Sequence, residues 1–225
     1  MLFLSFDIAS RSLAYTIMYY NPDVLSVISN DINKCKDIDV INNVEFALRN
    51  NIDVRLCDVS DINEGLTNKE VDILTKTKKL KYILTTIQTI LDDFKRELQI
   101  KNNGVDIKTV VLLEYQMPSN YQANAIFNKI YYHFVDYSPE VISPCYKNKI
   151  YFSEDLTYDK FTIKYKNTYS ANKSHTKANF LYFIESFGLK ERITHIKKKN
   201  LDDAADSFIQ IFAYINYYLK KNHIH

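Results

Sequence analysis

The alternation of apolar and polar residues predicts three strands in the first quarter of the chain. Two β-rich runs, "LFLSFDIA" and "LAYTIMYY", are joined by the short segment "SRS" and predict a hairpin. Further on, "DVRLCDV" alternates in the manner of a third strand. The Asn- and Asp-rich residues 21–52 give no clear period, so we expect an insertion there.

A helical period and a continuous apolar run follow in the middle of the chain. Apolar residues recur at spacings of three and four, which predicts one buried face of a long helix. These residues are Leu80, Leu84, Ile87, Leu91, Phe94 and Leu98. The segment "KNNGVD" ends this pattern, and "TVVLLEYQ" is apolar without a break from Val110 to Leu113. Such a run is typical of a central strand that is buried on both faces.

The second half of the chain predicts further helices around a short strand. "PSNYQANAIFNKIYYHF" predicts a helix with Pro118 near its start, and "EVISP" predicts a strand. Residues 147–170 alternate Lys with Tyr and Phe, so we expect a β-hairpin, as a second insertion. Helices are expected at 174–187, ended by Gly188, and from about Leu201. The order of elements predicts an α/β fold, a mixed central β-sheet flanked by helices, in a single domain of residues 1–225.

Composition excludes several classes of protein. The chain has only 3 Gly and lacks the glycine-rich motifs that cradle nucleotide phosphates. Its three cysteines, Cys35, Cys57 and Cys145, are far apart, which indicates free thiols in a reducing compartment. No stretch approaches the roughly 20 apolar residues that span a bilayer. We therefore expect a globular protein with no membrane partner.

Charge divides the chain into two unlike halves. Residues 1–100 carry 12 Lys and Arg against 15 Asp and Glu, whereas residues 101–225 carry 17 against 12. A basic C-terminal half predicts an anionic partner, most plausibly nucleic acid. Unevenly charged but merely solvated surface is the alternative.

Acids stand at the ends of two predicted strands and at the start of the last helix. Asp7 ends the first strand and Glu114 ends the central one; either could be a strand-end cap facing water. Asp202 and Asp203 suit the positive end of the helix macrodipole. Asp206 does not, because it lies at the edge of the apolar face and would need a partner or a metal ion. If the two strands are parallel neighbours, these carboxylates converge and favour Mg²⁺ or Mn²⁺.

Three segments in this order, "FDIAS", "LLEYQ" and "DDAADSF", resemble the RNase H-like nuclease fold. More specifically they resemble Holliday junction resolvases of the RuvC type, and most closely the poxvirus branch. The resemblance implies metal ligands at Asp7, Glu114, Asp203 and Asp206, with Asp202 as an alternative to Asp203. It also implies a catalytic lysine in "ANKSHTK", best matched by Lys173 and second by Lys177. Ala9 stands where related proteins often have Gly.

The resemblance implies a Mg²⁺-dependent (or Mn²⁺-dependent) endonuclease that resolves four-way DNA junctions, with two ions per active site. It further implies a homodimer and action in the host-cell cytoplasm during viral DNA replication. The helix after Glu114 is the expected dimer interface, through Ile126, Phe127, Ile130 and Tyr131. Two alternatives remain open: another RNase H-like nuclease, acting on hybrids or other branched DNA, and a junction-binding protein without catalysis.

Overall fold

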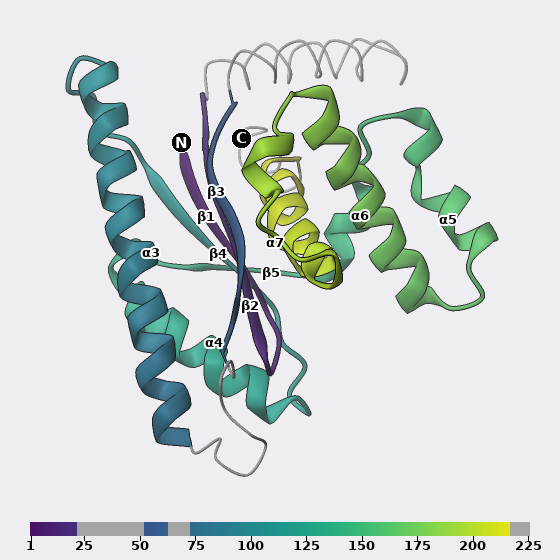
Figure 1. The fold of residues 1–225 in the computed structure, drawn as a ribbon, viewed down its shortest axis with the longest axis horizontal. Coiled ribbons are helices and arrows are strands. Elements are labelled where there is room, and N and C mark those ends of the chain that lie inside the picture. The colour runs from purple at the N-terminus through teal and green to yellow at the C-terminus, as the bar shows by residue number, and fades with distance from the viewer. Residues whose placement is uncertain (22–51, 63–72, 217–225) are drawn as a thin grey trace, which may run out of the picture.

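A five-stranded mixed sheet forms the centre of the computed structural model, which describes residues 1–21, 52–62 and 73–216 (Figure 1). The strands are β1 (Leu2–Ile8), β2 (Ser12–Tyr20), β3 (Ile52–Asp61), β4 (Thr109–Glu114) and β5 (Glu140–Ile142). The helices are α3 (Ile73–Lys101), α4 (Tyr121–His133), α5 (Tyr158–Lys164), α6 (Thr168–Ser186) and α7 (Leu201–Tyr214). The predicted α/β fold with a mixed central sheet is confirmed.

The strand order β3-β2-β1-β4-β5 places the two strands that end in acids next to each other. β1 pairs antiparallel with β2, as the predicted hairpin requires, and parallel with β4. In the parallel ladder Phe6 lies opposite Leu113, so the next residues, Asp7 and Glu114, come at the same end of the sheet. The two strands are therefore parallel neighbours, which is the condition for their terminal acids to converge.

Helices cover both faces of the sheet, and α7 and α6 lie on the face opposite α3 (Figure 1). Leu2, Leu4 and Phe6 pack with the six predicted apolar residues of α3, all of which are buried. Phe3 packs instead with α7. Because side chains alternate along a strand, Asp7 points to the same side as Phe3, toward α7.

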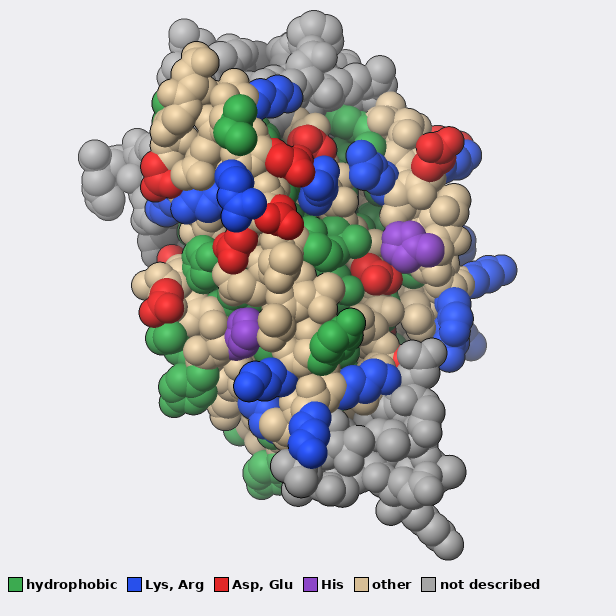
Figure 2. All heavy atoms as spheres, turned by 60° about the vertical axis from the view of Figure 1, so that its left-hand side comes forward, with side chains coloured by type: hydrophobic (Ala, Val, Ile, Leu, Met, Phe, Trp, Pro, Cys, Tyr) green, Lys and Arg blue, Asp and Glu red, His purple; other side chains and the backbone are tan. Residues whose placement is uncertain are grey.

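The outward face of α3 is a solvated surface. Figure 2 turns this side of the molecule forward and shows acidic and basic side chains interspersed over it. On α3 itself, Arg96 forms an ion pair with Asp93 at 3.0 Å, and Lys95 forms one with Asp106 at 3.3 Å. The helix thus has one apolar and one polar face, as its period predicted.

The last helix differs from its prediction in how much of it is buried. Every residue from Ala204 to Tyr214 is buried, not one face alone. The helix lies between the sheet and α6, and Phe208 packs against Phe180 and Phe183 at ring distances of 5.1 Å. A helix enclosed on all sides buries its polar residues together with its apolar ones. Asp206 is consequently only 5% exposed.

The prediction of a β-hairpin at residues 147–170 is wrong. The segment forms 3₁₀ turns and the short helix α5, and it begins within the 3₁₀ helix Pro144–Lys149. Its aromatic residues fill gaps on neighbouring helices rather than one face of a ladder: Phe152 packs against Phe183 and Phe212, at ring distances of 5.0 and 5.1 Å. An alternation of Lys with aromatic residues does not distinguish these two arrangements.

The boundaries of α6 also differ from the prediction of 174–187. The helix begins at Thr168, where the side chain of Asn167 caps it by accepting a hydrogen bond from the Ser170 amide at 2.8 Å. Gly188 ends it as predicted, with φ +66° and with the Leu189 amide bonded to the Ile184 carbonyl at 2.8 Å. The predicted insertion at 21–52 lies outside the described residues, apart from its two ends. In the described ranges no helix is long and apolar enough to cross a membrane.

Candidate active site

Three elements bring four of the predicted acids to one end of the sheet. Asp7 comes from β1, Glu114 from β4, and Asp203 and Asp206 from α7. Two side-chain hydrogen bonds fix α7 on the hairpin: Ser12 donates to Asp203 at 3.0 Å, and the hydroxyls of Thr16 and Ser207 lie 2.9 Å apart. Because Asp203 and Asp206 are three residues apart on a helix, they share one of its sides.

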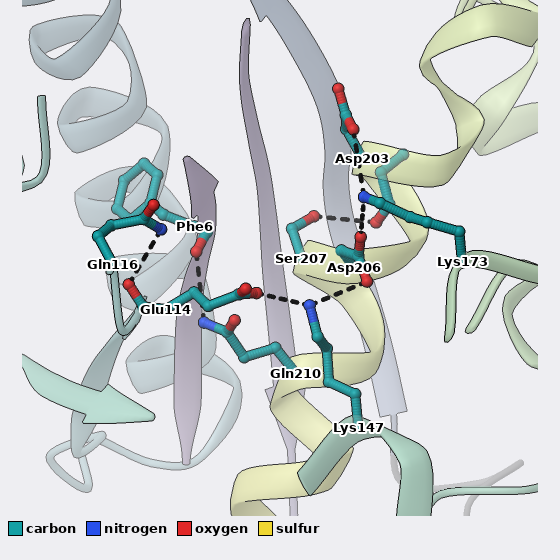
Figure 3. Close-up of polar contacts among 10 residues, drawn as sticks. Phe6, Glu114, Gln116, Lys147, Lys173, Asp203, Asp206, Ser207 and Gln210 are labelled. Carbon is teal, nitrogen blue, oxygen red and sulfur yellow. Dashed lines mark hydrogen bonds and ion pairs between the residues drawn. The ribbon is translucent and has the colours of Figure 1, made fainter. Parts of the chain in front are cut away.

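A lysine that the sequence analysis did not select lies between these acids. Lys147, in the 3₁₀ helix Pro144–Lys149, is only 6% exposed. Its Nζ lies 2.5 Å from Glu114 Oε2 and 2.9 Å from Asp206 Oδ1 (Figure 3). Nothing in its local sequence distinguishes it from Lys149, which is exposed two residues later. Its place follows from how the segment folds, and that fold was mispredicted.

The second lysine is the one that the resemblance selects. Lys173, from α6, donates to Asp206 Oδ2 and lies 3.6 Å from Asp203 Oδ1 (Figure 3). Lys177, one turn later, instead pairs with Asp202 at 2.7 Å. The structure therefore brings Lys173 and Asp203 together with the other acids. The Lys177–Asp202 pair lies beside them as a separate contact. We call Asp7, Glu114, Asp203, Asp206, Lys147 and Lys173 the acid–lysine cluster.

Burial and mutual charge shift the proton affinities inside this cluster. Burial raises the pKa of Asp7 well above its ordinary value, and the neighbouring Glu114 and Asp206 raise it further. Burial acts on Asp206 in the same direction, but Lys147 and Lys173 outweigh it and lower the pKa of that carboxyl. Lys147 and Lys173 lower the pKa of Asp7 as well, but they do not offset its burial and the two neighbouring acids.

Both lysines stay protonated. Burial alone would lower the pKa of Lys147, yet Asp206 and Glu114 more than offset it and raise the pKa above its usual range. The pKa of Lys173 is raised for the same reason, chiefly by Asp206. An ammonium with a raised pKa can stabilise negative charge but is a poor proton acceptor. The lysines therefore suit electrostatic roles and not that of a general base.

The donor atoms of the cluster match a hard divalent cation. Carboxylate oxygens are the ligands that Mg²⁺ and Mn²⁺ prefer. As the chain stands, no three Asp, Glu, His or Cys side chains among the described residues close around a common metal position. The ammonium of Lys147 holds the space between Glu114 and Asp206. Cation binding at these acids would therefore require this ammonium to shift toward solvent or substrate.

Comparison with known proteins gives a match in structure and none in sequence. No protein-family model matches the chain, and no curated protein does. The chain is similar to the fowlpox virus resolvase solved with substrate Holliday junction DNA, with TM-score 0.51, 18% identity, and coverage of 97% of this chain and 99% of that one. A structure of the fowlpox virus Holliday junction resolvase gives TM-score 0.48 and 16% identity, over 96% and 98%.

A bacterial structure is also similar. The RuvC of T. thermophilus in complex with Holliday junction substrate gives TM-score 0.47 and 10% identity, over 96% of each chain. At such identities the likeness concerns the fold. With its mixed sheet and flanking helices, this chain has the RNase H-like fold that it shares with the fowlpox virus resolvase structure.

Proposed function

We propose that this chain is a metal-dependent endonuclease that cleaves four-way DNA junctions at the acid–lysine cluster. The observation that carries the proposal is the meeting of Asp7, Glu114, Asp203 and Asp206 at one end of the sheet, with two protonated lysines among them. Four acids in so small a volume repel one another, so the arrangement is costly unless cations occupy it. The fold shared with the fowlpox virus resolvase supports the junction as substrate.

Each residue has a role in this proposal. Asp7, Glu114, Asp203 and Asp206 would hold two Mg²⁺ or Mn²⁺ ions, which would activate a water and offset the charge of the phosphodiester. Lys173 stabilises the negative charge that develops on the phosphate as the bond to the leaving oxygen breaks. Lys147 keeps Glu114 and Asp206 in place while the site is empty of substrate, through its ion pairs to both.

The proposal includes a homodimer, because a two-fold symmetric junction needs two opposed cuts and the described part of the chain forms one such cluster. On α4, however, Ile126 and Ile130 are buried in the core, and Phe127 and Tyr131 pack against it. The outward side of the helix instead presents Tyr132, which is 73% exposed. If α4 forms the interface, Tyr132→Glu should convert a dimer into a monomer in sedimentation experiments without DNA. Sedimentation of the wild-type chain as a monomer would contradict the dimer.

Action in the host-cell cytoplasm is also part of the proposal. It rests on the resemblance to the poxvirus branch and agrees with the two described cysteines, Cys57 and Cys145, which are free thiols. A reducing compartment is where such thiols persist.

One assay separates the proposed activity from its alternatives. The purified chain is incubated with labelled four-way junction, flap, duplex and RNA–DNA hybrid, with Mg²⁺, with Mn²⁺ or with EDTA, and the cuts are mapped. We expect paired cuts on opposed strands of the junction, only in the presence of a cation. Preferred cutting of the hybrid would identify a different RNase H-like nuclease. Tight junction binding without cuts in any cation would identify a binding protein.

A further inference from the structure

A buried glutamine beside the acid–lysine cluster has half of its side chain unsatisfied. Gln210 on α7 is only 1% exposed. Its amide nitrogen donates to the Phe6 carbonyl at 3.3 Å, but its Oε1, although buried, has no hydrogen-bond partner. Buried polar atoms are nearly always paired with protein or ordered water, so this oxygen is free to accept from a group that the chain does not itself supply.

The position of this amide is fixed by the same elements that carry the acids. Gln210 follows Asp206 by four residues, which places both on one side of α7. Phe6, which holds the amide nitrogen, immediately precedes Asp7 and pairs with Leu113, the neighbour of Glu114. Figure 3 shows the side chain of Gln210 reaching from α7 to β1, below the carboxylate of Glu114. The amide that carries the unpaired oxygen therefore lies next to the two strand ends from which Asp7 and Glu114 come.

Rotating the amide does not remove the problem, because the exchange would place its oxygen against the Phe6 carbonyl. A glutamine that served only to tie α7 to β1 would use its nitrogen alone, and this role leaves the oxygen unexplained. A second buried amide shows what complete pairing looks like. Asn179 on α6 donates to the carbonyls of Leu156 and His175, both at 3.1 Å, and accepts from the Phe152 amide at 2.9 Å.

We propose that Gln210 is an additional cation-site residue, whose amide oxygen faces a divalent cation held by Asp7 and Glu114, directly or through one water bound to that cation. Amide oxygens are ordinary partners of hard cations and of the water around them. The inference rests on the cation site of the proposed function and adds to it a residue outside the carboxylate set.

The test measures Mn²⁺ binding without DNA, so that it does not depend on cleavage. Calorimetry on the full chain compares wild type with Gln210→Met, which keeps the length of the side chain and removes the oxygen. We expect Mn²⁺ affinity to fall about 10-fold or more. In EDTA the melting temperature of Gln210→Met should equal or exceed that of wild type, because an unpaired buried oxygen has been removed. Asn179→Leu is the matched control, expected to melt lower and to keep its Mn²⁺ affinity.

A second variant keeps the idea testable if Gln210→Met does not fold. Gln210→Glu retains an oxygen and adds a buried negative charge, so it should melt below wild type in EDTA and gain more than wild type from added Mn²⁺. Unchanged Mn²⁺ affinity in Gln210→Met, or a Gln210→Glu variant that Mn²⁺ stabilises no more than wild type, would overturn the inference. A wild-type chain that binds no Mn²⁺ would overturn it too.

The outcome is separable from that of the proposed function. If the wild type binds Mn²⁺ and cuts junctions while Gln210→Met is unaffected, the inference alone fails. If Gln210→Met loses Mn²⁺ affinity but the wild type cuts none of the DNA substrates, the inference holds and the nuclease proposal fails.

Discussion

Two regions of the molecule supply the four acids and Lys147 of the acid–lysine cluster, and they are held in place by different interactions. The acids belong to β1, β4 and α7, where backbone ladders and a buried helix set their positions. Lys147 belongs to residues 144–166, which contain 3₁₀ turns and α5 but no strand. We call this segment the cap. Side chains attach it to α6: Tyr158 donates to Asn172 at 2.5 Å, and Asn179 bonds the backbone at Phe152 and Leu156.

The difference matters because a ladder resists local change and a set of side-chain contacts does not. Fixing one strand residue also fixes its partners on both neighbouring strands. A 3₁₀ turn has fewer backbone bonds and depends on what it packs against. We therefore expect substitutions in the cap to affect Lys147 while leaving the acids in place.

The largest effect is expected from the acids themselves. Asp203→Asn removes a proposed cation ligand while keeping the size of the side chain, so cleavage should fall by more than about 10³-fold. Junction binding should be kept or become tighter, since a negative charge near DNA is lost. Asp7→Asn and Glu114→Gln should behave alike. Single-turnover cleavage and a mobility shift in Ca²⁺ measure the two quantities.

The matched control for these variants is Asp202→Asn. Asp202 neighbours Asp203 but pairs with Lys177, so this change should leave the cleavage rate close to wild type. If Asp202→Asn is inactive and Asp203→Asn is active, the two aspartates have been assigned the wrong way round.

Lys173→Ala should give the next largest effect, a loss of about 10²–10³ in rate with little change in junction affinity. Its raised pKa keeps the ammonium charged. Its ion pairs hold it close to Asp203 and Asp206. Lys177→Ala, one helical turn away, is the control and should cost far less. The opposite ranking in single-turnover rates would move the catalytic lysine to Lys177.

The same contrast explains how much the sequence could predict. Asp7 and Glu114 end runs whose strand character is evident, and their meeting needs only a parallel pairing of two strands. Asp206 stands out as an acid at the edge of an apolar helix face. The pattern of the last helix predicted its position but not its enclosure on all sides, because α6 packs on it through contacts distant in sequence. Lys147 and Gln210 were not predicted, since neither belongs to a motif and each depends on tertiary contacts.

Replacing Lys147 tests how much this residue of the cap contributes to the stability of the fold. Lys147→Met leaves the buried Asp206 and the half-buried Glu114 without their shared partner, which should lower the free energy of unfolding in EDTA by about 3–5 kcal/mol. Mn²⁺ should reduce this loss, because a cation replaces the missing charge. Urea unfolding with and without Mn²⁺ measures both. Lys149→Met, on the same turn but exposed, is the control; an equal loss there would argue against a special role for Lys147.

The smallest effect is expected at His175, a residue of α6 that packs against the cap. It is fully buried on α6, and the rings of Tyr158 and Phe161 in the cap each lie 5.4 Å from its ring. Burial lowers its pKa from 6.5 to about 4, so the folded chain holds it neutral. Above pH 6.5 both folded and unfolded chains carry it neutral, and its contribution is fully present. As the pH falls from 6.5 toward 4 the unfolded chain takes up the proton first, and stability is lost.

His175→Leu should remove this part of the pH dependence and leave stability near neutral pH close to that of the wild type. Urea unfolding of both chains between pH 7 and 4 provides the comparison, with a steeper fall expected for the wild type. Because the ring of His175 packs against Tyr158 and Phe161 of the cap, amide exchange should rise first in the cap as the pH is lowered, and later in β1 and β4. Equal loosening of the cap and of β1 would show that the two regions unfold as one unit, and the distinction between a ladder-held and a side-chain-held half of the site would then not hold.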